Sequence, residues 1–240
     1  METVGHNGIN PWQNALPRAS VIHKLTNLLC SSKFVVMSSA AATGKTSILQ
    51  LVQRINFQLP HSFMYIRMSS SISPYDLFKA RGIDLLNGTL SSALLGKDFI
   101  ILLDDAQVAY GFVDFWGALI KDPSVHALLS KFKFVISATY LLSGSGSPVV
   151  FEDLSRILPS DMLLSEDEAF QFLNDPAMGL PSELMSFNIL KGMMVNECNG
   201  SIGALRIASE TLADRLKHTT ITETTAVQVY MSKDMVVSYG

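Results

Sequence analysis

The chain has 240 residues, of which 48% are hydrophobic and 16% are charged. This composition excludes an intrinsically disordered protein, and the length is sufficient for one sizeable globular domain or for a core domain with a small accessory one. The formal net charge of -3 gives no overall attraction to nucleic acid or to an anionic membrane, so the charge indicates no nucleic-acid partner.

The two cysteines, Cys30 and Cys198, lie far apart in the chain, which favours a reducing compartment and excludes a cysteine-built zinc site. The N-terminal stretch lacks the basic and apolar regions of a signal peptide. The longest apolar run, "FIILL", is far shorter than the roughly 20 residues needed to span a bilayer. We therefore expect a cytoplasmic or otherwise intracellular protein that has no membrane partner.

Strand and helix patterns alternate along most of the chain. Short apolar or β-branched runs predict strands over residues 33–38, 63–69, 99–107, 133–140 and 161–165. Helical spacing of apolar residues predicts helices over residues 19–30, 44–55, 74–95 and 107–121. An exposed loop is expected at 143–148, where the sequence reads "SGSGSP".

Beyond the last predicted strand the pattern is helical only, up to about His218. Ser165 and Glu168 have the spacing of a capping box that opens a helix through about Asn174. The dipeptide "NG" at 199–200 is a typical helix end. This order predicts an α/β fold, with a three-layer core around a parallel sheet and a small helical lid subdomain after it.

Residues 35–50, "VVMSSAAATGKTSILQ", have the phosphate-binding pattern G-x-x-x-x-G-K-[ST], except that Ser39 replaces the first glycine. Gly44 permits close backbone approach, Lys45 supplies a cation for the β- and γ-phosphates, and Thr46 supplies a hydroxyl for Mg²⁺. An alanine-rich helix start is the alternative, but the junction of a predicted strand and helix favours the loop. The predicted nucleotide-binding residues here are Ser39, Ala40, Ala41, Ala42, Thr43, Gly44, Lys45, Thr46 and Ser47.

The three alanines of this loop have an energetic consequence. Some residues of a phosphate-binding loop adopt left-handed backbone angles, and an alanine held there costs roughly 1–2 kcal/mol relative to glycine. We therefore expect a loop that binds ATP weakly and turns it over slowly.

The run "FIILLDD" predicts a buried strand that ends in two acids. Asp104 would hold Mg²⁺, directly or through water, and Asp105 would orient or deprotonate the attacking water. Two solvated acids at a strand end are the alternative. Two carboxylates at the tip of a buried strand are costly unless a cation or another partner lies there, which favours the metal site.

Three further residues are candidates for sensing the nucleotide. Thr139 lies at the tip of the predicted strand "FVISATY", where a polar residue would sense the γ-phosphate; turn hydrogen bonding explains it equally well. Arg206 could reach the γ-phosphate from the helical lid, and a solvated arginine is an equal alternative. Arg156 lies where an intersubunit arginine finger would lie, although a solvated role is favoured there.

In this order, the stretches SSAAATGKT, FIILLDDAQ, VISATY, LLSEDEA and GSIGALR resemble the AAA-like and STAND-like P-loop ATPases. The stretches LLDDAQ and SATYLLSGSGSPVVFEDLSRI are most similar to the NTPase module of the Crinkler-type effector proteins of oomycetes and fungi. The resemblance covers about residues 18–218. It implies ATP and Mg²⁺ as ligands, Asp105, Lys45 and Thr139 as catalytic residues, and a homo-oligomer or a protein partner. For a Crinkler-like effector it also implies secretion into host cells and a nuclear destination.

The sequence departs from this family in three places. The translocation region of full Crinkler proteins is not found, and Asp105 stands where a glutamate is usual. Residues 219–240 resemble the start of a further unit that is cut short. The predicted domains are an N-terminal segment with its leading helix (1–32), a P-loop NTPase core (33–164), a helical lid (165–218) and a tail or partial unit (219–240).

We expect an ATPase module whose hydrolysis drives a conformational switch or an assembly. A nucleotide-binding scaffold without hydrolysis is the main alternative, and the altered loop supports it. A small-molecule P-loop kinase is less favoured, because residues 165–218 predict a long bundle with few arginines instead of a short arginine-rich lid. A GTPase is disfavoured, because no [NT]-K-x-D motif follows the loop.

Overall fold

The computed structural model describes residues 15–55, 61–141, 151–176, 180–217 and 221–232. The chain forms two compact units. The first unit contains Ala19–Ala41 and Lys45–Asp161. The second contains the residues from Met162 onward, together with Ala42–Gly44 and the described residues up to Arg18.

The first unit is built on a five-stranded parallel sheet in the order β2-β5-β6-β1-β7. Its strands are β1 (Phe34–Ser38), β2 (Ser62–Arg67), β5 (Phe99–Asp104), β6 (Phe132–Ala138) and β7 (Ser155–Ile157). A central parallel strand is buried on both faces and therefore reads as a continuous apolar run, and all six residues of β5 are buried. Strand β6 lies between β1, which precedes the candidate phosphate loop, and β5, which ends in Asp104.

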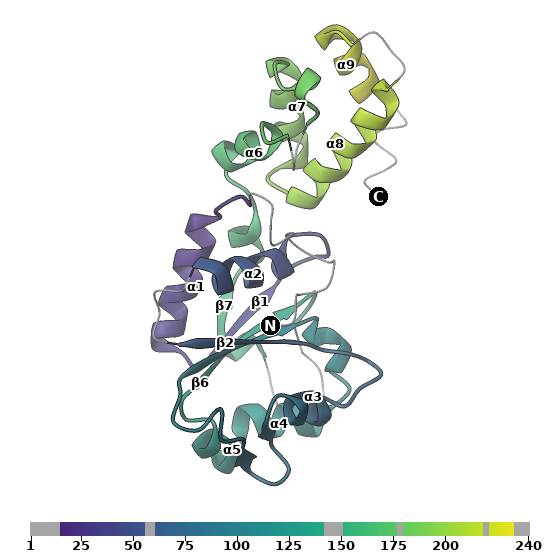
Figure 1. The fold of residues 1–240 in the computed structure, drawn as a ribbon. Coiled ribbons are helices and arrows are strands. Elements are labelled where there is room, and N and C mark those ends of the chain that lie inside the picture. Colours follow the sequence, from purple (N-terminus) through teal and green to yellow (C-terminus); the bar gives the residue numbers. More distant parts are fainter. Residues whose placement is uncertain (1–14, 56–60, 142–150, 177–179, 218–220, 233–240) are drawn as a thin grey trace. The chain divides into compact units, whose positions relative to one another are not determined.

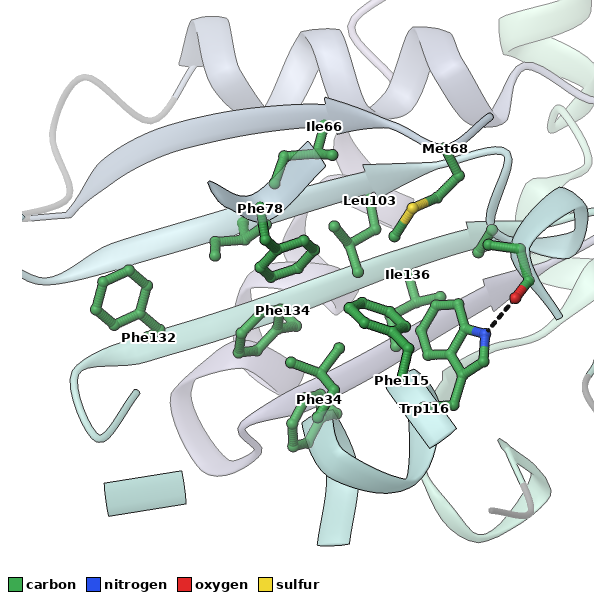
Figure 2. Close-up of a cluster of buried hydrophobic side chains, with 14 of the residues drawn as sticks. Phe34, Ile66, Met68, Phe78, Leu103, Phe115, Trp116, Phe132, Phe134 and Ile136 are labelled. Carbon is green, nitrogen blue, oxygen red and sulfur yellow. Dashed lines mark hydrogen bonds between the residues drawn. The ribbon is translucent and has the colours of Figure 1, made fainter. Parts of the chain in front are cut away.

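Helices cover both faces of this sheet (Figure 1). Helices α1 (Ala19–Ser31) and α2 (Lys45–Ile55) lie on one face, and α3 (Pro74–Ala80), α4 (Val113–Lys121) and α5 (Pro123–Leu128) lie on the other. In Figure 2, Phe115 and Trp116 of α4 pack against Phe134 and Ile136 of the sheet, and the Trp116 indole donates a 2.9 Å hydrogen bond to the Ala109 carbonyl. The predicted α/β layers are confirmed.

The long helix predicted over 74–95 is wrong. Helix α3 ends at Ala80, and a short antiparallel pair follows, β3 (Ile83–Asp84) with β4 (Thr89–Leu90). The Asp84 carboxylate accepts hydrogen bonds from the backbone and side-chain nitrogens of Asn87, at 3.1 and 2.9 Å. Gly82 and Gly88 have φ of 83° and 63°, which no right-handed helix contains. These local turn contacts outweigh the helical spacing of the apolar residues.

The fifth strand was predicted over 161–165, and that prediction is also wrong. The strand that pairs with β1 is β7, and residues Pro159–Met162 form a 3₁₀ helix, η4. The Asp161 carboxylate accepts a 2.7 Å hydrogen bond from the Leu158 N–H, which forms a turn in place of a strand. Arg156, which the sequence placed between the fourth and fifth predicted strands, therefore lies within the edge strand β7, in register with Val36.

Two smaller differences concern the segments on either side of β6. The helix predicted over 107–121 is divided into a 3₁₀ helix, η2 (Ala106–Ala109), and α4, and α5 was not predicted. The loop predicted at 143–148 lies outside the described residues.

The second unit is helical, with α6 (Glu166–Leu173), η5 (Ser182–Leu184), α7 (Asn188–Cys198), α8 (Ile202–Leu216) and α9 (Glu223–Tyr230). The predicted capping box is confirmed, because Ser165 and Glu168 each accept a hydrogen bond from the other's backbone N–H. The predicted helix end at 199–200 is also confirmed: a Cβ on Gly200 would lie 2.6 Å from the Leu164 carbonyl oxygen, so only glycine fits.

A single apolar core holds these helices together. It includes Leu173 of α6, Met194 of α7, Leu212 of α8 and Ala226 of α9. Helix α9 packs against α7 and α8 within this core. In the part of the chain that the structure describes, no helix is long and apolar enough to cross a bilayer.

Candidate functional site

The candidate phosphate loop connects the end of β1 to the first residue of α2, Lys45. Of its three alanines only Ala42 has a left-handed backbone, with φ of 60°, and Gly44 has φ of 86°. Left-handed residues in such a loop turn successive N–H groups toward one side, and the start of α2 adds further N–H groups that have no partner within the helix. The loop therefore has backbone features suited to an anion.

The Lys45 side chain folds back toward the first residues of this loop. Its Nζ donates hydrogen bonds of 2.6 Å to the carbonyl oxygens of Ser39 and Ala40. Burial lowers the pKa of Lys45, while the nearby carboxylates of Asp104 and Asp105 raise it. One cationic group is thus held between the loop and the two candidate acids.

Thr46, the next residue of α2, makes the contact that joins the loop to the acid strand. Its Oγ1 donates a 2.8 Å hydrogen bond to Oδ2 of Asp104, the last residue of β5. Asp104 is only 2% exposed, so this carboxylate is held inside the unit. Residues separated by more than fifty positions in the sequence therefore meet at one carboxylate oxygen.

Tyr65 of β2 is a second partner of Asp104, which the sequence did not predict. Its hydroxyl donates a 2.7 Å hydrogen bond to the same Oδ2 atom. Burial raises the pKa of Tyr65, and the adjacent Asp104 carboxylate raises it further, so the hydroxyl keeps its proton. A tyrosine in a β-rich run carries no distinguishing signal, because only the pairing of β2 with β5 brings it to Asp104.

Ser137 of β6 lies beside Asp104 on the neighbouring strand. Leu103 pairs with Ile136 and both face the core shown in Figure 2, so the next residues, Asp104 and Ser137, face the opposite side, toward α2. Ser137 is fully buried, and its hydroxyl has no hydrogen-bond partner among the described residues. Since a buried unpaired hydroxyl costs about 1–3 kcal/mol, its presence beside a carboxylate indicates a place for a further polar group.

These oxygens are the kind that Mg²⁺ prefers. Magnesium is usually held by one or two protein oxygens together with substrate phosphates and several waters. The Thr46 hydroxyl and the Asp104 carboxylate fit that description, and the unpaired Ser137 hydroxyl is a suitable partner for a metal-bound water. Within the described residues there is no cluster of three or more His, Cys, Asp or Glu side chains, so a metal held by protein groups alone is not indicated.

Asp105 has a different environment. Its backbone is left-handed, with φ of 55°, and its Oδ2 accepts a 2.9 Å hydrogen bond from Nε of Arg67. Its Oδ1 lies 3.4 Å from Nε2 of Gln107, whose Oε1 accepts a 3.0 Å hydrogen bond from the backbone N–H of Thr139. Gln107, also missed from the sequence, therefore connects the second acid to the end of β6.

A pocket of about 390 Å³ opens beside this acid, lined by the charged pair Arg67 and Asp105 and by apolar side chains that include Ile72, Leu77 and Val108. The pocket lies beyond the end of β2, and its lining does not include Thr46 or Asp104. Asp105 thus lines this pocket, whereas Asp104 does not.

The remaining candidate residues are not part of these contacts. Arg206 lies on α8 of the helical unit, where its Nε pairs with Glu210 at 2.8 Å and both side chains are largely exposed. Such an i,i+4 pair contributes a few tenths of a kcal/mol, roughly 0.3–0.5. Arg156 lies on the edge strand β7, and Ser47 is half-buried in the first turn of α2. The nucleotide-binding role of Arg206 remains a prediction.

No protein-family model matches the sequence, and no curated protein is similar to it. Among solved structures, a Walker-type ATPase of Pyrococcus abyssi is similar, with a TM-score of 0.53 and 15% identity over 97% of this chain and 77% of that one. PCH-2 of C. elegans has a TM-score of 0.49 and 12% identity over 90% of this chain and 63% of that one. Cdc6p of Pyrobaculum aerophilum has a TM-score of 0.49 and 16% identity over 87% of this chain and 65% of that one.

The likeness to the Pyrococcus protein concerns the fold, because at this level of identity individual residues and activities are not carried over. A five-stranded parallel sheet in the order β2-β5-β6-β1-β7, followed by C-terminal helices, is typical of the AAA+ class of P-loop NTPases. The chain has the fold of that class.

Proposed function

We propose that this chain is an ATP-binding module that hydrolyses Mg²⁺-ATP to drive a conformational switch or an assembly. The observation that supports this most is the 2.8 Å hydrogen bond from Thr46 to Asp104. It joins the start of the helix that carries Lys45 to the end of the buried acid strand, which is the pairing that phosphate and magnesium binding require.

Each residue of the proposed site has a separate role. Lys45 and the N–H groups at the start of α2 bind the β- and γ-phosphates, and Thr46 and Asp104 hold Mg²⁺. When bound, Mg²⁺ neutralises charge on the phosphate oxygens. Asp105 orients the attacking water or removes its proton, and Thr139 senses the γ-phosphate. Arg206 is a further candidate for binding the nucleotide.

A nucleotide-binding scaffold without hydrolysis is the second candidate. One observation favours it: the Asp105 oxygen that would contact a water is held by Arg67 at 2.9 Å. A module that binds ATP but leaves Asp105 paired in this way would change shape on binding and release the nucleotide unhydrolysed.

A more specific proposal is that this chain is part of a larger Crinkler-like effector; the stretches LLDDAQ and SATYLLSGSGSPVVFEDLSRI support it. The domain boundaries at 33–164 and 165–218, a homo-oligomer, and an intracellular or nuclear location are proposals as well. Recovery of the full-length gene product tests the effector proposal, since an attached domain would identify the output.

The test of the ATPase proposal is a titration of the purified chain with a fluorescent ATP analogue, with Mg²⁺ and with EDTA, followed by phosphate release. Lys45→Ala should abolish or strongly weaken binding, and Lys97→Ala, an exposed lysine elsewhere in the same unit, should leave it unchanged. Binding without phosphate release, even in Asp105→Glu, would favour the scaffold. A wild-type chain that binds no nucleotide would contradict both candidates.

A further inference from the structure

Among the described residues, Asp104 receives two hydroxyl donors on one oxygen and none on the other. Thr46 Oγ1 and the Tyr65 hydroxyl both donate to Oδ2, at 2.8 and 2.7 Å. Within the described part of the chain, no side chain or backbone N–H donates to Oδ1. Since an ionised carboxylate has about four acceptor positions, two on each oxygen, the two hydroxyls occupy one oxygen and leave the other to a further ligand.

The register of the sheet explains how Tyr65 reaches this position. Tyr65 pairs with Leu102 and Arg67 pairs with Asp104 in the parallel β2–β5 ladder. Side chains alternate between faces, so Tyr65, Leu102 and Asp104 share the face that lies against α2. The phenol ring spans the distance along the strand that separates Leu102 from Asp104. A phenylalanine at this position would fill the same space without the donor.

The hydroxyl is also constrained in its chemistry. A tyrosine hydroxyl is a donor as long as it keeps its proton, and here it donates to Oδ2 of Asp104 at 2.7 Å. A hydrogen bond to a charged group is stronger than one between neutral groups, and it resists rotation of the carboxylate. Thr46 alone would not hold the carboxylate in this orientation, because its hydroxyl has to reorient if it coordinates magnesium.

We infer that Tyr65 is a positioning residue for the magnesium site: its hydroxyl holds Oδ2 of Asp104 so that Oδ1 stays directed to the metal or to a metal-bound water. This inference rests on the proposed function, because it concerns how Asp104 meets Mg²⁺. Tyr65 acts through Asp104 and does not contact the nucleotide.

The experiment compares the wild-type chain with Tyr65→Phe in two titrations of a fluorescent ATP analogue. The first varies Mg²⁺ at fixed nucleotide, and the second varies nucleotide in EDTA. Removal of the hydroxyl should raise the Mg²⁺ concentration at half-saturation by roughly three- to tenfold, which corresponds to the net contribution of one typical hydrogen bond. Affinity in EDTA should be unchanged, because the phosphate contacts of Lys45 and the loop remain.

Tyr75→Phe is the matched control, since Tyr75 is a partly buried tyrosine of α3 in the same unit whose ring packs on Phe115. Its Mg²⁺ midpoint should equal that of the wild type. Thermal unfolding of both variants shows whether each is folded, and a merely structural role for Tyr65 would lower the melting temperature and weaken binding in EDTA as well. That outcome would overturn the inference.

Two other results separate this inference from the proposed function. An unchanged Mg²⁺ midpoint in Tyr65→Phe, with binding still lost in Lys45→Ala, would overturn the role of Tyr65 and leave the ATP site intact. A wild-type chain that binds no nucleotide would overturn the proposed function, and the inference with it.

Discussion

Nε of Arg67, at the end of β2, donates a 2.9 Å hydrogen bond to Oδ2 of Asp105, immediately after β5. The two side chains are 51% and 33% exposed, so their pairing contributes little stability, about 0–1 kcal/mol. Its consequence is chemical. The guanidinium occupies one acceptor position of this oxygen and fixes its orientation, so Arg67 restrains the acid proposed to activate the attacking water.

Removal of this restraint should raise turnover. We expect Arg67→Ala to increase phosphate release by up to about fivefold, which corresponds to the upper limit of about 1 kcal/mol for an exposed ion pair, with little change in melting temperature. Phosphate release at saturating Mg²⁺-ATP measures it, and Lys121→Ala is a control for the loss of an exposed cation. Reduced turnover in Arg67→Ala would instead assign Arg67 a direct part in the reaction.

Asp104→Ala should remove the Mg²⁺ dependence of nucleotide binding. It should also lower the free energy of unfolding by about 1–3 kcal/mol, because the hydroxyls of Thr46 and Tyr65 lose their common acceptor. Binding with and without EDTA, together with urea denaturation, measures the two effects. The exposed Asp98 provides the control Asp98→Ala, and a Mg²⁺ dependence retained in Asp104→Ala would point to a different metal ligand.

Ser137→Ala should separate stability from function. Removal of a buried hydroxyl that lacks a partner should stabilise the ligand-free chain by about 1 kcal/mol. The same change should weaken Mg²⁺-ATP binding severalfold, if a metal-bound water shares that hydroxyl. Thermal unfolding without nucleotide measures the expected gain in stability, and a binding titration with Mg²⁺ measures the expected loss of affinity. A loss of stability without nucleotide would show that the Ser137 hydroxyl has a hydrogen-bond partner in solution.

Ala42→Gly should strengthen the loop. Ala42 has φ of 60°, so glycine at this position removes backbone strain of about 1–2 kcal/mol from the folded chain. Part of this gain is offset, because glycine also increases the conformational entropy of the unfolded chain. We expect a net gain of up to about 1 kcal/mol in the free energy of unfolding. Ala41→Gly is the matched control, because Ala41 has a negative φ, and it should be neutral or destabilising. Equal effects of the two substitutions would contradict the assignment of strain to Ala42.

The two cysteines should react very differently with a thiol reagent. Cys30 is exposed, whereas Cys198 is buried, and burial raises the pKa of its thiol to about 11. Since the thiolate is the reactive form, a thiol of pKa 11 is ionised to about 0.1% at pH 8, and its reactivity rises only as the pH approaches 11. The native chain at pH 8 should therefore titrate one thiol rapidly and the denatured chain two. Rapid reaction of both in the native chain would contradict the packing of Cys198.

Local patterns in the sequence were sufficient to predict the α/β layers and the candidate site residues Lys45, Thr46 and Asp104. The strand runs of β1 and β5 are apolar because both faces of a parallel sheet are buried, and this makes them recognisable without neighbours. The GKT triplet and the paired acids are each contiguous, so Lys45, Thr46 and Asp104 could be chosen from the sequence. The prediction of one helix over 74–95 was wrong, because the apolar spacing carries no information about the side-chain contacts of Asp84 with Asn87.

The order of the strands was decided only by the tertiary structure, and the partners of Asp104 follow from that order. Thr46 belongs to the recognisable GKT triplet, but Tyr65 of β2 and Ser137 of β6 have no distinguishing pattern around them. They meet because β2, β6 and α2 each pack against β5 in one register, which is set by the burial of many apolar side chains together. The sequence by itself determined which residues could bind phosphate and magnesium. The packing of the sheet decided which side chains surround them, because a register fixed by the whole core cannot be read from any single strand.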